Sequence, residues 1–104
     1  MSRRNRVIGP HRDPHSDAVF RALADPTRRR VLELLFDGER PVADLVAACA
    51  TTQPAMSQHL RTLREAGLAQ YRQDGRRRLY RIEEAPLHEV MAWLMRYDGG
   101  SPRH

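Results

Sequence analysis

The stretch TTQPAMSQHLRTLREAGL, residues 51–68, constrains the fold of this chain more than any other segment. It is typical of one capped helix, because Thr52 can accept a hydrogen bond from a first-turn amide and Pro54 is tolerated in that turn. Gly67 supplies the stop, since glycine adopts a left-handed backbone at low cost. The apolar residues recur at the spacing of one buried stripe and are Ala55, Met56, Leu60, Leu63 and Ala66.

The opposite face of this helix is polar. It carries amide, hydroxyl and guanidinium groups, which are the groups that contact base edges and hold phosphates in protein–DNA complexes. We therefore predict a DNA-recognition helix. Its candidate DNA contacts are Gln53, Ser57, Gln58, Arg61 and Arg64.

The charge of the chain is concentrated around the same segment. Of 18 basic and 13 acidic side chains, residues 51–81 hold seven arginines against two acids, and residues 1–15 hold four arginines against one. The remaining segments, 16–50 and 82–104, are slightly acidic. This placement is what a nucleic-acid footprint requires. A basic surface without a partner is the alternative.

Several function classes are disfavoured by what the sequence lacks. A single cysteine, Cys49, excludes an internal disulfide and fits a reducing cytoplasm. No apolar run approaches the ~20 residues that span a bilayer, and no hydrophobic stretch follows the basic N-terminus as it would in a secretory signal. No nucleophile–base pair or acidic dyad stands out. We expect a cytoplasmic protein with no membrane contact, no enzymatic activity, no cofactor and no small-molecule substrate.

Three helices are predicted before the recognition helix. Residues 1–16 form a basic flexible arm, either a solvated tail or an arm that reaches DNA. Residues 17–24 form a short helix, and Asp25-Pro26 begins a second helix that Gly38 ends. The arginines at 28–30 lie where the helix dipole disfavours them, so a phosphate or acidic partner holds them or they form a solvated face. A third helix over residues 41–49 completes a helix-turn-helix.

After Gly67 the apolar residues alternate, which predicts strands. Asp74-Gly75 is a strong hairpin signal, because both central positions of a type I′ turn need positive φ. We predict two antiparallel strands with an arginine-rich tip. This β-wing must pack on the helices, since an isolated hairpin is marginally stable. Its candidate anchors are Leu68, Tyr71, Leu79, Tyr80 and Ile82.

The last predicted helix, residues 85–98, has more apolar surface than a small core requires, and residues 99–104 follow it as a flexible tail. Such a surplus on a terminal helix indicates a partner surface. We favour a homodimer to which the first helix contributes. The predicted dimerisation residues are Val19, Phe20, Leu87, Val90, Met91, Trp93, Leu94 and Tyr97. The alternative is that Trp93 and Tyr97 cap the protomer's own core.

This order of elements is a winged helix-turn-helix, and the chain resembles the arsenic-repressor (ArsR) family of bacterial transcriptional repressors. The resemblance is carried by FRALADPTRRRVLELL (20–35), QPAMSQHLRTLREAGL (53–68) and DGRRRLYRI (74–82). It implies a mainly α fold with a two-stranded β-wing over residues 17–98, and a homodimer that represses transcription from an inverted-repeat operator in double-stranded DNA. The groove contacts it implies are Gln53, Ser57, Gln58, His59 and Arg61, and the wing contacts are Arg76, Arg77 and Arg78. For His59, a local hydrogen bond that holds the helix is the alternative.

Many members of that family sense metals. The arsenic- and cadmium-type site uses two cysteines at positions that Pro41 and Ala43 occupy here. The zinc-type site uses ligands along the last helix, where His88 is the only histidine and Gly99 stands eleven residues on. Because a site needs three or four ligands, no metal site is expected, and the chain resembles the metal-independent, autorepressor-like branch.

Three alternatives stay open at the level of sequence. The chain could be a sensor that uses an unrecognised metal site, or one that uses Cys49 as a redox-active thiol rather than as a buried, inert side chain. It could also be a winged-helix module for protein–protein contact. The operator sequence, the regulated genes and any inducing signal do not follow from the amino-acid sequence.

Overall fold

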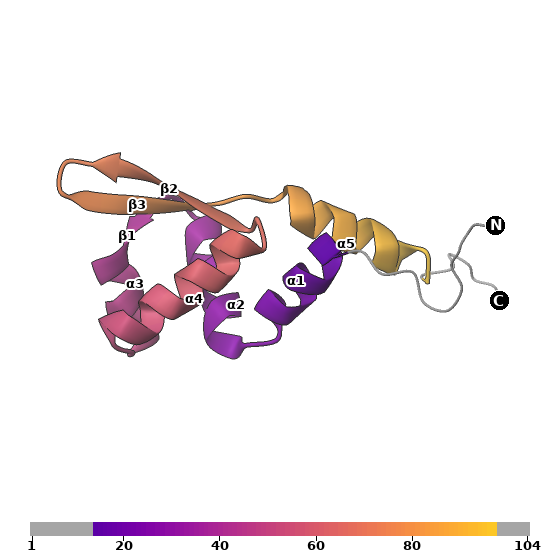
Figure 1. Ribbon diagram of the computed structural model, residues 1–104, viewed down its shortest axis with the longest axis horizontal. Coiled ribbons are helices and arrows are strands. Elements are labelled where there is room, and N and C mark those ends of the chain that lie inside the picture. Colours follow the sequence, from indigo (N-terminus) through magenta and orange to yellow (C-terminus); the bar gives the residue numbers. More distant parts are fainter. Residues whose placement is uncertain (1–13, 98–104) are drawn as a thin grey trace.

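The structure, a computed structural model, describes the backbone of residues 14–97 and the side chains of residues 17–97. Most of the predicted arm and all of the predicted tail lie outside the described residues. The elements are α1 (Pro14–Leu23), α2 (Pro26–Phe36), β1 (Arg40–Pro41), α3 (Val42–Cys49), α4 (Gln53–Glu65), β2 (Ala69–Asp74), β3 (Arg77–Ile82) and α5 (Ala85–Met95). In Figure 1 the hairpin, α3 and α4 lie at one end of the molecule, and α1 packs beside α5 at the other.

Local caps set the starts of two central helices as the sequence predicted. The Asp25 carboxylate accepts a hydrogen bond from the Arg28 amide at 3.0 Å, and the Thr52 hydroxyl accepts one from the Ala55 amide at 3.2 Å. A proline stands in the first turn of both helices. Helix α1 begins at Pro14, so it extends three residues into the segment assigned to the arm. None of the described helices is long and apolar enough to cross a membrane.

The turn between α3 and α4 bends at Ala50, whose φ is +51°. The amides of Ala50 and Thr51 donate to the carbonyls of Ala47 and Val46, both at 3.3 Å, which satisfies the end of α3. A left-handed conformation costs a non-glycine residue roughly 1–2 kcal/mol. The helix-turn-helix therefore holds a strained residue at its corner.

The wing belongs to a three-stranded antiparallel sheet in the order β1-β3-β2. The alternating pattern predicted the two strands of the hairpin but not β1, whose two residues pair with Tyr80 and Leu79. Strand β1 starts directly before α3, so this pairing attaches the wing to the beginning of the helix-turn-helix.

The position of the hairpin turn was predicted incorrectly by one residue. Asp74 pairs with Arg77, so the two central residues are Gly75 and Arg76 rather than Asp74 and Gly75. Of these two, only Gly75 has a positive φ, at +64°. This is the pattern of a type II′ turn instead of the predicted type I′. Arg76 consequently stands at the tip of the wing.

The hydrophobic core lies between the first four helices and the inner side of the wing. Its largest fully buried side chains are Leu35, Leu45, Met56, Leu60, Leu63, Leu68, Val19 and Val31. The wing packs on this core through Leu68 and Tyr80, with Tyr71 and Ile82 partly buried against it, which confirms four of the predicted anchors. Leu79, the fifth, is buried outside this cluster. Helix α5 adds little to the core, because Pro86 and Val90 are its only buried residues.

Candidate nucleic-acid interface

Helix α4 lies on the core along one side and leaves the other side in solvent. Met56, Leu60 and Leu63 are at most 1% exposed. The five side chains predicted for its polar face are exposed: Gln53, Ser57, Gln58, Arg61 and Arg64. The two-faced helix predicted from the sequence is therefore present, while the DNA contacts of these side chains stay predictions.

The side chains of Arg61 and Arg64 make weak contacts with neighbouring residues of the same protomer. The Arg61 Nε donates to Glu65 Oε2 at 3.2 Å, one helical turn away. The Arg64 guanidinium lies 4.9 Å from the centre of the Tyr71 ring, and the guanidinium of Arg78 lies 4.3 Å from the same ring. Exposed ion pairs are worth ~0.2–1 kcal/mol, and exposed cation–π contacts a similar amount. A phosphate can therefore replace these partners at small cost.

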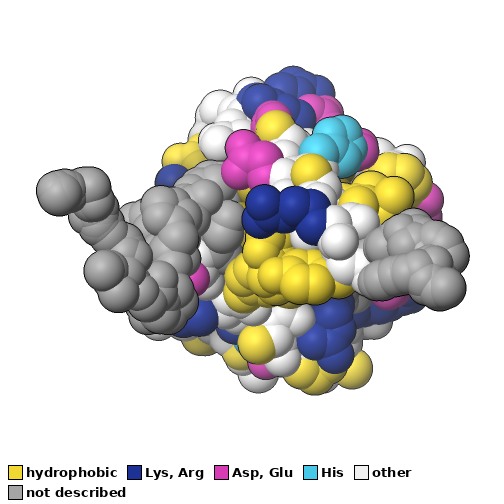
Figure 2. All heavy atoms as spheres, turned by 90° about the vertical axis from the view of Figure 1, so that its right-hand side faces the viewer, with side chains coloured by type: hydrophobic (Ala, Val, Ile, Leu, Met, Phe, Trp, Pro, Cys, Tyr) yellow, Lys and Arg dark blue, Asp and Glu magenta, His cyan; other side chains and the backbone are white. Residues whose placement is uncertain are grey.

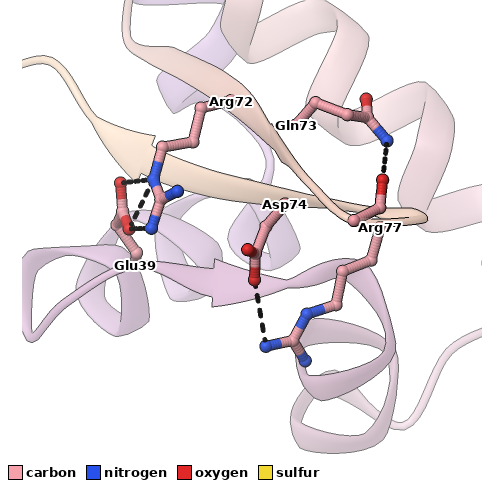
Figure 3. Close-up of polar contacts among 6 residues, drawn as sticks. Glu39, Arg72, Gln73, Asp74 and Arg77 are labelled. Carbon is pink, nitrogen blue, oxygen red and sulfur yellow. Dashed lines mark hydrogen bonds and ion pairs between the residues drawn. The ribbon is translucent and has the colours of Figure 1, made fainter.

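The base of the wing is tied to the loop before β1 (Figure 3). Arg72 Nε and Nη2 donate to the Glu39 carboxylate at 3.0 to 3.2 Å. The Glu39 carboxylate raises the pKa of Arg72, first through this hydrogen bond and then through its charge. Closer to the tip, Arg77 Nη2 lies 3.5 Å from Asp74 Oδ2, and the Gln73 amide donates to the Gly75 carbonyl at 3.3 Å.

The tip itself is less constrained. Arg76 and Arg78 are exposed, and among the described residues neither forms an ion pair with an acidic side chain, whereas Arg72, Arg77 and Arg81 each do. The three arginines predicted as wing contacts thus divide into Arg77, which has a weak partner, and two whose charges are not neutralised by a described carboxylate. The electrostatic surplus of the wing is greatest at its tip.

His59 differs from the other candidate contacts on α4. Its side chain is only 20% exposed and faces the beginning of α2. The ring Nδ1 lies 3.4 Å from Arg28 Nη1 and 3.8 Å from Asp25 Oδ2. This position favours the local role weighed above over the groove contact that the family resemblance implied.

The arginines at the start of α2 have partners that the sequence did not reveal. Arg28 donates through Nε to the Ala22 carbonyl at 2.8 Å and through Nη2 to the Arg21 carbonyl at 2.9 Å. Arg29 donates to the Leu23 carbonyl at 2.7 Å. These carbonyls end α1, where the helix dipole favours positive charge. The arginines that the dipole of α2 disfavours therefore stabilise the end of α1.

Asp25 joins the same group of side chains. The hydrogen bond from the Arg28 amide lowers the pKa of the Asp25 carboxyl, burial opposes that effect, and the charges of His59 and Arg28 add to it. Asp25, Arg28 and His59 form a polar cluster, here called the α1–α2–α4 junction, where three helices meet.

The described residues offer little for a metal or thiol sensor. Cys49 is partly buried against the core, and burial raises the pKa of its thiol while the charge of Arg30 opposes the rise. A neutral, half-buried thiol reacts slowly, which supports the inert reading of Cys49. Within residues 17–97, no three His, Cys, Asp or Glu side chains come together as metal ligands would.

The end of the molecule opposite the wing exposes large apolar side chains. Phe20 of α1 packs edge-on against Trp93 of α5 with ring centres 5.6 Å apart, and Trp93 packs against Tyr97 at 5.2 Å. Figure 2 looks onto this end and shows hydrophobic side chains gathered beside a basic one. The exposed members, here called the apolar end, are Phe20, Met91, Trp93, Leu94, Met95 and Tyr97.

Three predicted dimerisation residues do not belong to this exposed surface. Val19 is 0% exposed and Val90 is 7% exposed, so both pack inside the protomer, and Leu87 is partly buried against the core. Their helical faces point inward because α1 and α5 use these positions to pack on the rest of the domain. Trp93 is 42% and Tyr97 71% exposed in the protomer.

Comparison with known proteins identifies the family. The sequence pattern of bacterial regulatory proteins of the arsR family matches residues 25–71, from the cap of α2 into the first strand of the wing. The HTH-type transcriptional regulator Rv2034 of Mycobacterium tuberculosis is 37% identical over 90 residues, which cover 86% of this chain and 82% of the relative. This chain belongs to the arsR family. It is a DNA-binding transcriptional regulator, and the family is not enzymatic.

Two further similarities bear on this arsR-family chain. A probable mercury resistance operon repressor of Streptomyces lividans is 41% identical over 72 residues, which cover 69% of this chain and 58% of that protein. The solved homodimeric winged helix-turn-helix DNA-binding domain of Mb0332 from Mycobacterium bovis, a possible ArsR-family regulator, has a TM-score of 0.68 and 30% identity, covering 86% of this chain and 84% of that one. The predicted mainly helical fold with a small antiparallel wing is confirmed.

Proposed function

We propose that this arsR-family chain represses transcription by binding an inverted-repeat operator as a homodimer. The observation that carries the proposal is the exposed polar side of α4 beside a wing whose tip holds uncompensated arginines. In a two-fold dimer, the two copies of α4 enter successive major grooves and the wings lie on either side.

The contacts divide by chemistry. Gln58 and Arg61 can form paired hydrogen bonds with adenine and guanine edges, and Gln53 and Ser57 lie on the same exposed side. Arg64 and the wing residues Arg76, Arg77 and Arg78 supply charge to phosphates or the minor groove. The first group selects the sequence, and the second supplies affinity on any duplex.

The second protomer covers the apolar end. Homodimerisation is typical of the family, and the solved relative from M. bovis is homodimeric. The exposed aromatic row of Phe20, Trp93 and Tyr97 is the kind of surface that anchors protein interfaces.

We also infer that repression here is independent of a bound metal. Pro41 and Ala43 occupy the positions of the cysteine pair, and His88 has Glu84 as its partner at 3.6 Å on α5. Similarity to a mercury resistance repressor leaves a metal sensor as the second candidate. Elemental analysis of the purified protein, with DNA binding measured before and after addition of Zn²⁺ or Hg²⁺, separates the two, because stoichiometric metal with release of DNA would overturn the metal-independent proposal.

Selection of duplexes from a random pool tests the main proposal. We expect an inverted repeat whose half-sites are centred about 10–10.5 base pairs apart or a multiple of that distance, bound by two protomers. Equal affinity for the selected duplex and a scrambled duplex of the same composition would refute sequence-specific repression. Failure to bind any duplex at low salt would instead favour a module for protein–protein contact.

A further inference from the structure

The α1–α2–α4 junction connects the two ends of the protomer through one side chain. Arg28 binds the last carbonyls of α1 through Nε and Nη2, at 2.8 and 2.9 Å, and its Nη1 faces His59 Nδ1 of α4 at 3.4 Å. Helix α1 carries Phe20 of the apolar end, and α4 carries the proposed base contacts. The Arg28 guanidinium group is therefore a physical link between the helix that carries part of the apolar end and the helix that carries the proposed base contacts.

The chemistry of the link fixes the direction of its hydrogen bonds. A guanidinium group can only donate, so the hydrogen bond between Arg28 and His59 requires the neutral tautomer in which Nδ1 accepts and Nε2 carries the ring proton. Asp25, whose carboxylate lies 3.8 Å from the same Nδ1, caps α2 by accepting from the Arg28 amide. Two charged groups therefore face His59 from α2 and its cap, the Arg28 guanidinium and the Asp25 carboxylate. The contacts of α1 with this group are made by backbone carbonyls, which bind Arg28.

This link adds a directional contact to the packing of the core. Helix α4 rests on the core through Met56, Leu60 and Leu63, which fixes the face that is buried. A hydrogen bond weakens steeply when its angle changes, so it resists rotation of α4 about its axis. His59 directly follows Gln58, one of the proposed base contacts, so a rotation of α4 that displaces His59 also displaces that contact.

We propose that Arg28 and His59 are positioning residues that hold α4 at a fixed angle to α1 and thereby determine which half-site spacing the dimer accepts. This inference rests on the proposed function as a dimeric reader of an inverted repeat. Arg28 and His59 act on DNA through Gln58 and its neighbours, and not by touching a base.

The test compares two duplexes with the full-length protein. One is the inverted repeat selected by the unmodified chain, and the other has two base pairs inserted between its half-sites, which rotates them by about 70° relative to each other. The measured quantity is the ratio of two dissociation constants, that of the duplex with the insertion divided by that of the selected duplex. A lower folded fraction weakens both complexes by the same factor, so this ratio does not change when a variant is merely less stable.

Four variants give the proposal its controls. Arg28→Gln and His59→Leu remove the link from either side, and we expect each to lower the ratio about tenfold, the effect of one hydrogen bond to a charged group. His59→Asn keeps an acceptor near the position of Nδ1 and should restore the ratio. Arg30→Gln removes the same charge from the same helix, where Arg30 forms an ion pair with Glu33 and no hydrogen bond to α1 or α4 is seen among the described residues, and should leave the ratio unchanged.

The outcomes separate this inference from the function on which it rests. If the unmodified chain binds both duplexes equally, the paired-half-site function itself fails. If the unmodified chain discriminates and Arg28→Gln and His59→Leu discriminate equally well, the function stands and the positioning role is refuted. A lowered ratio in both variants, restored by His59→Asn, supports the link.

Discussion

The wing end and the apolar end of this protein expose opposite chemistry for a reason that lies in the core. At the wing end, Met56, Leu60 and Leu63 complete the core, so the outward side of α4 is free to be polar. At the other end, α5 buries Pro86 and Val90 and leaves Met91, Trp93, Leu94 and Met95 exposed. The core is covered at one end of the protomer, while large apolar side chains are exposed at the other. Under the proposed function, DNA reading and pairing therefore lie on separate surfaces of one small domain.

A charge placed in the apolar end should have the largest effect. Trp93→Glu puts a carboxylate where the proposed interface excludes water, at the aromatic anchor between Phe20 and Tyr97. Loss of such an anchor costs ~2–4 kcal/mol, or at least about 30-fold in the dimer dissociation constant. Sedimentation equilibrium measures it. Phe36→Glu is the matched control, because Phe36 is 66% exposed on α2 outside the apolar end. Equal weakening by both variants would contradict the assignment of this surface.

Removal of a base contact should be next in size. Gln58→Ala should cost ~1–3 kcal/mol on the selected duplex and relax the preference at one base pair of each half-site. The dimer should remain intact, since Gln58 is on the opposite end from Trp93. Fluorescence anisotropy on the selected duplex and its single-base variants measures both effects. A uniform loss on every duplex would show that this side chain supports affinity and not selection.

The junction between the two ends should respond to pH through Asp25. Because folding lowers the pKa of this carboxyl, its charge stabilises the folded state above the unfolded value of about 3.9. That stabilisation is lost as the pH falls through the lower, folded-state pKa. Asp25→Ala removes the cap of α2, which should lower the free energy of unfolding by ~0.5–2 kcal/mol. Because this variant lacks the titrating carboxyl, its free energy of unfolding should fall less between pH 5 and pH 2 than that of the unmodified chain.

Urea unfolding at each pH measures this dependence. Asp25→Asn is the matched control, because asparagine can still cap α2 without the titrating charge. We expect Asp25→Asn to retain most of the stability at pH 7 and to show the same flattened pH dependence as Asp25→Ala. An unchanged pH dependence in both variants would assign the acid sensitivity to other carboxylates.

The smallest effect should come from the tip of the wing. Arg76→Ala should weaken binding to all duplexes alike and reduce the slope of log K against log[salt] by about 1. Arg81→Ala is the matched control, since Arg81 is paired with Glu83 at 3.2 Å and contributes less free charge. Equal slopes for Arg76→Ala and the unmodified chain would show that the tip does not reach DNA.

The parts of the fold that depend on local chemistry could be predicted from the sequence. Asp25 and Thr52 predicted the starts of α2 and α4, because a cap and the proline that follows it are close neighbours in the chain. The polar side of α4 followed from its period. Strand β1 could not be found, because two residues, one of them Pro41, cannot show an alternating pattern. The turn was misplaced because its position follows from the pairing of β2 with β3, in which Asp74 stands opposite Arg77.

The parts that depend on contacts between distant segments were out of reach. The sequence shows three arginines in an unfavourable place at the start of α2, but not that the carbonyls of Arg21, Ala22 and Leu23 end a helix beside them. Similarly, an apolar stripe on α5 does not reveal which members turn inward. Val90 is buried and Met91 is exposed although both were predicted as dimerisation residues.

The sheet of the wing has strand edges that are not paired with another strand, and charged side chains lie along these edges. Strand β2 pairs on one side only, and β1 covers only Leu79 and Tyr80 of β3. An uncovered strand is a template on which another chain can add and begin an aggregate. Arg72 and the arginines of β3 place exposed positive charge along these edges, which opposes the pairing of two wings. We therefore expect a variant with an apolar wing to aggregate more readily than the unmodified chain.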